Sequence, residues 1–79
     1  MNVKVYSTPN CPWCVRAKAY LQENGIPFTE VDVSRDVAAA REMVKISGQM
    51  GVPVITINGN VIVGFDKERI DELLGLKGQ

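Results

Sequence analysis

The stretch VKVYSTPNCPWCVRAKAYLQENG, residues 3–25, decides the fold because a short turn joins a strand pattern to a helix pattern. Residues 3–7 alternate and carry β-branched valines, which predicts a strand. Residues 8–10 have the composition of a turn, and Pro12 suits the first position of a helix. Three residues at helical spacing share one predicted inward face: Cys14, Ala17 and Leu21.

The residues that follow predict a second strand and a second helix. Asn24-Gly25 is a helix stop, and residues 27–33 then favour a strand. Ser34 is expected to cap a helix that runs to about Ser47. Its inward face is expected to consist of Val37, Ala40 and Val44.

The last third of the chain predicts a hairpin and a short helix. Residues 53–57 and 60–63 favour two strands, and the Asn58-Gly59 pair between them is typical of a type I′ turn. Asp66 can cap a final helix. Its expected inward residues are Ile70, Leu73 and Leu74.

These elements occur in the order β-α-β-α-β-β-α, which predicts an α/β fold. A strand–helix–strand unit gives a parallel pair with a right-handed crossover, and the hairpin adds an antiparallel pair. The predicted architecture is a four-stranded mixed sheet with three helices on its faces. The chain has 79 residues and no internal repeat or linker, so residues 1–79 are expected to form a single domain.

The charge balance and the missing histidine narrow the classes of function. Nine basic and nine acidic residues cancel, so no net charge attracts nucleic acid or an anionic membrane. Without histidine, the chain lacks the usual general base and the commonest metal ligand. The start, residues 1–7, lacks the pattern of a secretory signal, and no apolar run reaches the length of a membrane span. A cytoplasmic location is therefore expected.

Cys11 and Cys14 are the only cysteines, and three uses are open to them. As a structural clamp they would close a very small loop, worth only about 2 kcal/mol. As a metal site they would supply two of the four ligands that zinc usually takes. As a redox pair they have the C-x-x-C spacing beside a βαβ pattern that is typical of thiol–disulfide chemistry.

The position of each cysteine favours the redox use. Cys11 lies at the start of the predicted helix, where unpaired N–H groups and the helix dipole stabilise a thiolate. Cys14 lies one turn later on the inward face and should be less exposed. Cys11 is therefore expected to attack a disulfide and Cys14 to resolve the mixed disulfide, leaving the two oxidised together. Pro12 stiffens the turn between them.

Three segments resemble the glutaredoxin family of the thioredoxin-fold superfamily. CPWC (11–14) resembles the CPYC active site, SGQMGVP (47–53) resembles S-G-Q-x-T-V-P, and NGNVIVGFD (58–66) resembles I-N-G-x-x-I-G-G-x-D. Together they span most of the chain. The resemblance implies a thioredoxin-like fold and a thiol–disulfide oxidoreductase, a redox-active enzyme of electron transport and cell redox homeostasis.

The resemblance also implies roles for residues outside the cysteine pair. Pro53 is expected to follow a cis peptide bond and to face the cysteines, with the Val52 backbone pairing with an extended thiol substrate. Trp13 takes the tyrosine position and is expected to offer an exposed contact surface.

Glutathione is the co-substrate that the resemblance implies, and the positions that would bind it are Thr8, Val52, Gly64 and Asp66. Thr8 stands where the family has lysine, and Gly51 stands where it has threonine. Asp66 is either a contact to the glutamyl end of glutathione or a plain helix cap. These departures make glutathione a weaker expectation than the CPWC motif alone would give.

Two other functions remain open at this point. A small redoxin similar to the NrdH-like proteins would take electrons from thioredoxin reductase and serve ribonucleotide reductase. A protein of another class would carry an iron–sulfur cluster or zinc between two protomers. For the redoxin functions we expect a monomer with no bound cofactor and no metal, whose partners are proteins that contain disulfides.

Overall fold

The computed structural model describes residues 1–76 and has the predicted element order. The elements are β1 (Val3–Ser7), α1 (Pro12–Glu23), β2 (Thr29–Asp32), α2 (Val37–Ser47), β3 (Val54–Ile57), β4 (Asn60–Val63) and α3 (Lys67–Leu74). They form one four-stranded mixed sheet with three helices, so the predicted thioredoxin-like fold is confirmed.

The register of the sheet determines which loops meet. The strand order is β2-β1-β3-β4, with β1 parallel to β2 and antiparallel to β3, and β3 antiparallel to β4. Tyr6 near the end of β1 lies opposite Val54 at the start of β3, which in turn lies opposite Val63 at the end of β4. The loops that contain Cys11, Pro53 and Gly64 therefore leave the sheet at the same edge.

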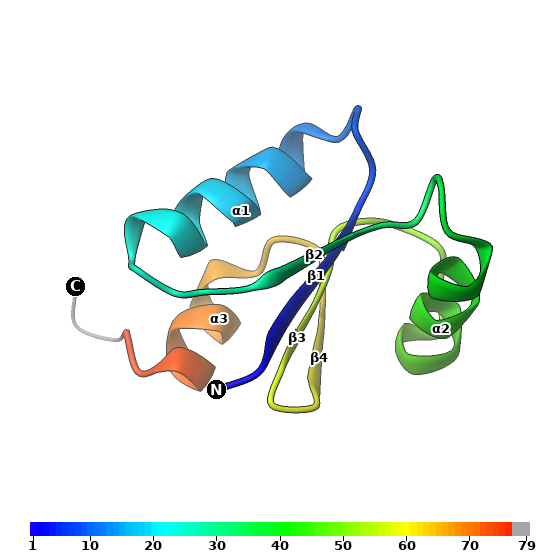
Figure 1. Cartoon of the computed structure of the whole chain (residues 1–79). Coiled ribbons are helices and arrows are strands. Elements are labelled where there is room, and N and C mark those ends of the chain that lie inside the picture. The colour runs from blue at the N-terminus through cyan, green and yellow to red at the C-terminus, as the bar shows by residue number, and fades with distance from the viewer. Residues whose placement is uncertain (77–79) are drawn as a thin grey trace.

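The helices divide between the two faces of the sheet, with α1 and α3 on one face and α2 on the other (Figure 1). The α1 and α3 face holds the larger core, because alternate residues of β1 and β3, together with Ile62 of β4, point to it. That core consists of Val3, Val5, Ala17, Leu21, Ile55, Ile57, Ile62 and Ile70. The α2 face holds a smaller cluster of Tyr6, Met43 and Val54.

The predicted start, end and inward face of the first helix are confirmed. Cys11 is the N-cap and Pro12 the first helical residue, while Gly25 has a φ of +67° after the helix ends. The hairpin turn is also confirmed, because Asn58 and Gly59 have φ values of +50° and +89°, as a type I′ turn requires. Asp66 caps α3 as predicted.

The predicted cap of the second helix was wrong. Asp36 caps α2, with its carboxylate accepting from the Ala39 N–H at 3.0 Å. Ser34 instead belongs to a turn, in which its N–H and hydroxyl both donate to Asp32, at 2.9 Å and 2.5 Å. Asp32, two residues before Ser34, holds Ser34 in this turn, and the helix begins two residues later than predicted.

The predicted inward face of α2 was also wrong. Met43 is the buried residue of this helix, whereas Val37 is 68% exposed and Val44 is exposed as well. Burial of Tyr6 explains the rotation, because its hydroxyl needs a partner. Glu42 accepts that hydrogen bond at 2.8 Å, so α2 turns its Glu42 and Met43 side toward the sheet.

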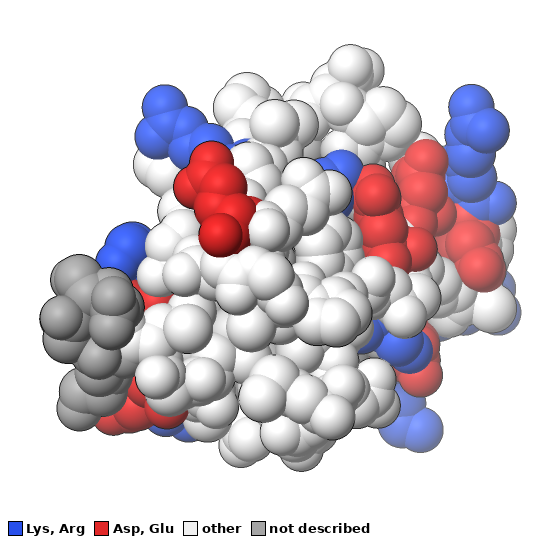
Figure 2. All heavy atoms as spheres, turned by 60° about the vertical axis from the view of Figure 1, so that its left-hand side comes forward, with Lys and Arg blue, Asp and Glu red and all other residues white. Residues whose placement is uncertain are grey.

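Charged side chains leave much of one side of the molecule uncovered. Figure 2 shows a broad uncharged area through the middle of this side of the molecule, with charged groups mostly around it. Among residues 1–76, none of the helices is both long enough and apolar enough to span a bilayer.

Loss of the Tyr6 hydroxyl should lower stability in a pH-dependent way. Burial, together with the bond to Glu42, raises the pKa of Tyr6 to about 12, above the value of about 10 in an unfolded chain. The resulting stabilisation is full below pH 10 and is lost as the pH rises toward 12. At pH 7 we expect the free energy of unfolding of Tyr6→Phe to be about 1 kcal/mol lower than that of the unaltered protein. Between pH 10 and 12 the free energy of unfolding should fall less in Tyr6→Phe than in the unaltered protein.

Urea unfolding of the two proteins, followed by circular dichroism across that pH range, measures the difference. Tyr20 is present in both proteins, so its ionisation cancels in the comparison. Parallel stability curves would contradict a role for Tyr6 ionisation.

Candidate active site

The sulfur of Cys11 caps the first turn of α1. Cys11 has an extended backbone (φ −122°, ψ 104°), and its Sγ accepts a hydrogen bond from the Cys14 N–H at 3.1 Å. A helix start leaves several N–H groups without partners, and an acceptor side chain normally satisfies one of them. Here the acceptor is the Cys11 thiol sulfur. Pro12 follows it at the first helical position, where a residue without an N–H is tolerated and the chain turns into the helix. The Cys11 sulfur is therefore held by the helix start.

The sulfur of Cys14 lies beneath the helix start, out of solvent. The residue is fully buried, whereas Cys11 is partly exposed. Burial, and next the hydrogen bond to Cys11, raises the pKa of the Cys14 thiol to about 11. A backbone hydrogen bond from Thr8 and the positive charge of Lys18 act in the opposite direction. Thr8 thus contributes through its main chain to the cysteine pair.

The loop before β3 forms the wall opposite Cys11. The Val52–Pro53 peptide bond is cis, as the resemblance implied. The Val52 carbonyl oxygen lies 3.8 Å from Cys11 Sγ, close enough for a weak hydrogen bond from the thiol. Gly64 donates its N–H to the Pro53 carbonyl at 2.8 Å, which joins the end of β4 to this wall. Within the described part of the chain, no hydrogen bond occupies the Val52 N–H.

Gln49 fixes the segment that leads into this wall. Its side-chain amide accepts from the Gly51 N–H at 2.6 Å and donates to the Gly51 carbonyl at 3.1 Å. A Cβ atom at Gly51 would lie 2.7 Å from the Gln49 oxygen. Glycine at this position therefore lets one side chain satisfy both backbone groups, which is a local reason for the departure from threonine.

An apolar groove runs beside the cysteines, and we call it the thiol groove. It encloses about 270 Å³ and is lined by Trp13, Val52, Pro53, Gly64 and Phe65. Trp13 is 54% exposed. Its ring is tilted against Phe65 with 6.4 Å between centroids, and the Arg16 guanidinium lies 4.8 Å above it. The groove thus offers aromatic contact and a free main-chain donor next to a thiol.

Two charged groups near this region, Asp66 and Lys67, already have partners. Asp66 accepts from the Arg69 N–H at 3.2 Å as the cap of α3, and Lys67 pairs with Asp71 at 2.9 Å. Asp71 is also hydrogen-bonded to the Tyr20 hydroxyl. The plain helix-cap role that the sequence left open for Asp66 is therefore present.

The structure brings most of the predicted site residues together. Cys11, Cys14 and Pro12 form the helix start, while Trp13, Val52, Pro53 and Gly64 line the thiol groove. Sequence reasoning missed Phe65 and Gln49. An aromatic residue between Gly64 and the capping Asp66 was the only signal for Phe65, and Gln49 was visible only as part of the SGQ segment.

In residues 1–76 no group of three or more Cys, Asp or Glu side chains is arranged to hold a metal ion. The cysteine pair alone provides two sulfur ligands. The local chemistry that the geometry offers is thiol–disulfide exchange.

The fold and the paired cysteines define a thiol–disulfide redoxin with a thioredoxin-like architecture. The family model described as Glutaredoxin matches residues 3–62. The chain therefore belongs to the glutaredoxin family.

Individual relatives agree with this assignment. The chain is 51% identical over 72 residues to a Clostridium pasteurianum protein described as an uncharacterized glutaredoxin-like 8.6 kDa protein in the rubredoxin operon, covering 91% of this chain and 96% of that one. It is 42% identical over 65 residues to glutaredoxin 3 of Escherichia coli K12, covering 82% and 78%. Among solved structures, the glutaredoxin-like NrdH-redoxin from Escherichia coli superposes with a TM-score of 0.81 at 25% identity, covering 92% and 95%.

The pH dependence of Cys14 should be visible in the resolution step. In a mixed disulfide on Cys11, the hydrogen bond and charge of Cys11 no longer raise the pKa of Cys14, but burial still does. At pH values below the pKa of Cys14, the rate of resolution should therefore rise about tenfold for each unit of increase in pH. Lys18→Met removes a charge that lowers the Cys14 pKa, and should slow resolution about two- to fivefold at pH 7–8, the size of a partly exposed ion interaction.

Stopped-flow release of a thiol from a preformed Cys11 mixed disulfide, from pH 6 to pH 10, measures this rate. Lys45→Met, a substitution in the last turn of α2, is the matched control. A rate that does not change with pH would contradict proton loss from Cys14 as the controlling event.

Proposed function

We propose that this chain is a dithiol thiol–disulfide oxidoreductase in which Cys11 attacks and Cys14 resolves. The observation that supports it best is the placement of Cys11 Sγ at the N-cap of α1, 3.1 Å from the Cys14 N–H. A sulfur at that position is partly exposed and faces a backbone donor, so a substrate disulfide can reach it. The buried Cys14 lies within one helical turn of it.

The reaction transfers two electrons from the protein to a substrate disulfide. The Cys11 thiolate forms a bond to one substrate sulfur, and the other substrate sulfur leaves as a thiolate and takes up a proton. Cys14 then loses its proton and attacks Cys11 Sγ. The second substrate thiolate leaves, and the protein is left with a Cys11–Cys14 disulfide.

The substrate that fits this site is a disulfide in an extended peptide or a glutathione mixed disulfide. The unoccupied Val52 N–H can pair with the substrate main chain as an added β-strand does. Trp13 and Phe65 provide apolar contact on the other side of the thiol groove. Recognition would then rest on main-chain hydrogen bonds and apolar area, with little dependence on substrate charge.

The reductant that returns the pair to the dithiol state has two candidates. Glutathione is the one that the family implies. None of the residues that line the thiol groove is charged, so none can bind the carboxylates of glutathione through an ion pair. This observation favours thioredoxin reductase. The similarity to NrdH-redoxin, whose structure is described in terms of a thioredoxin-like activity profile, supports the second candidate. Both candidates fit a reducing compartment such as the cytoplasm.

Replacement of each cysteine separates their roles. Cys11→Ser should reduce protein-disulfide reduction to background, because no attacking thiolate remains at the helix start. Cys14→Ser should retain the attack and accumulate a mixed disulfide on Cys11. Mass spectrometry after mixing with an oxidised protein substrate shows the adduct, and retained dithiol turnover in Cys11→Ser would refute the assignment.

A reductant test distinguishes the two candidates. Oxidised protein is mixed either with glutathione or with NADPH and a bacterial thioredoxin reductase, and Trp13 fluorescence is followed. We expect the reductase to act at least tenfold faster at matched conditions, because glutathione finds no charged partner in the thiol groove.

Thiol titration of the same samples provides the control for the fluorescence signal. Trp13 is the only tryptophan and lies between Cys11 and Cys14 in sequence, so its emission should change with the state of the pair. Equal or faster reduction by glutathione would instead establish a glutathione-dependent enzyme.

A further inference from the structure

Exposed apolar residues of α2 border a second groove, which we call the α2 groove. It encloses about 360 Å³ and is lined by Val33, Val37, Ala40, Arg41, Val44 and Met50. Five of these six side chains are apolar. Met50 is 80% exposed, and Val37 is also largely exposed. A concentration of exposed apolar side chains beside a concave surface is typical of a binding site.

The α2 groove is connected through the chain to the wall opposite Cys11. Met50 precedes Val52 by two residues, and the Val52 carbonyl lies 3.8 Å from Cys11 Sγ. The Gln49 amide holds the intervening Gly51 in place. An extended chain advances about 3.3 Å per residue. A polypeptide paired with Val52 would therefore bring a side chain to Met50 within about two residues of the paired position.

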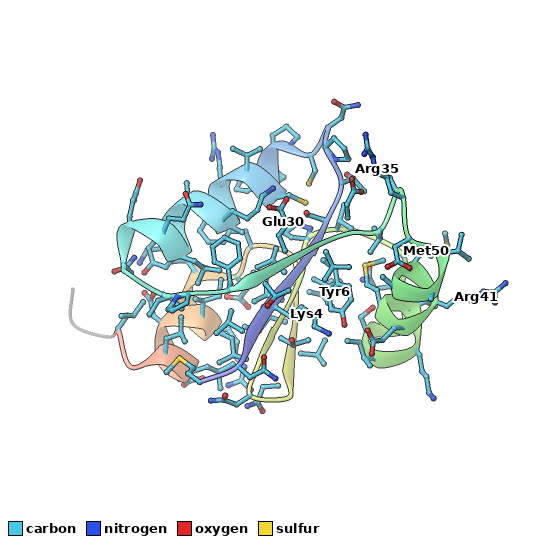
Figure 3. All side chains as sticks on the ribbon, in the orientation of Figure 1. Lys4, Tyr6, Glu30, Arg35, Arg41 and Met50 are labelled. Carbon is cyan, nitrogen blue, oxygen red and sulfur yellow. The ribbon has the colours of Figure 1, made fainter. Side chains whose placement is uncertain are left out.

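One of the side chains that line the α2 groove, Arg41, is positively charged. Figure 3 labels Met50 beside α2, Arg41 on the same helix and Arg35 on the loop that precedes it. Arg35 makes only a 3.8 Å contact with Asp32. Among the described residues, no ion pair reaches Arg41. An occupant that combines an apolar side chain with a carboxylate complements this surface.

We propose that the α2 groove binds the polypeptide that flanks the disulfide of a protein substrate, with an aliphatic or aromatic side chain against Met50 and Val37 and a carboxylate beside Arg41. The inference rests on the proposed function, because it places the reacting disulfide at Cys11. Glutathione is too short to supply an apolar side chain at this distance. The α2 groove would thus let the protein prefer polypeptide disulfides over small ones.

Two peptides with one central cysteine each test the proposal. The cysteine is activated as a mixed disulfide with 5-thio-2-nitrobenzoate, whose release is followed in a single turnover of the reduced protein. One peptide carries leucine and glutamate on both sides of the cysteine, and the other carries glycine and serine. We expect the first to react about tenfold faster, equivalent to about 1.4 kcal/mol.

Variants of the α2 groove should remove this preference. Val37→Ser combined with Met50→Ser should lower the rate with the leucine–glutamate peptide about tenfold and leave the rates with the glycine–serine peptide and with hydroxyethyl disulfide unchanged. Arg41→Glu should reverse a preference for glutamate over lysine in the flanks. Val61→Ser, at an exposed apolar position on β4 that does not line the groove, is the matched control.

The outcomes separate failure of the groove from failure of the proposed function. Equal rates for both peptides, or equal losses for all three substrates in the double variant, would overturn the α2 groove proposal while disulfide reduction stands. No release of 5-thio-2-nitrobenzoate from either peptide by the unaltered protein would overturn both. A dimer in sedimentation that the double variant converts to a monomer would show that a second copy of the chain occupies the groove, which also overturns the proposal.

Discussion

The antiparallel pairing of β1 with β3 is the constraint on which the site depends. Val5 and Ile55 lie opposite each other and are fully buried, so a slip of one residue would turn the core residues of one strand to the other face of the sheet. This register brings the end of β1 to the start of β3. The chain after β1 contains Cys11 and the chain before β3 contains Val52, so two segments about forty residues apart in sequence form one thiol site.

The same register explains why so few side chains are needed at the site. The Val52 carbonyl, the Pro53 carbonyl and the Gly64 N–H are main-chain groups at one edge of the sheet. Their positions follow from strand pairing, and substitutions in the loops leave them largely intact. Side chains then adjust the site, as the Gln49 amide does where Gly51 leaves room for it.

Sequence patterns predicted the elements that depend on neighbouring residues in the chain or that pack against a uniformly apolar surface. The face of α1 that contains Ala17 and Leu21 meets a broad aliphatic core, so periodicity alone identified it. The orientation of α2 could not be predicted in this way, because it depends on one hydrogen bond between Tyr6 and Glu42 on elements distant in sequence. Ser34 was misassigned because a serine after an aspartate fits a turn as well as a helix cap.

The capping role of Cys11 has a consequence for the energetics of the whole redoxin. The Cys11 sulfur, which is the attacking atom in the proposed function, also satisfies an N–H of the first turn of α1. Such a bond is stronger when the acceptor carries a full charge, and that charge disappears when the sulfur enters a disulfide. A thermodynamic cycle then requires any extra folding stability of the reduced state to appear as an equal change in the reduction potential of the pair. Substitutions along α1 that change its helical stability in one redox state more than in the other would therefore shift the reducing power of the protein without touching either sulfur.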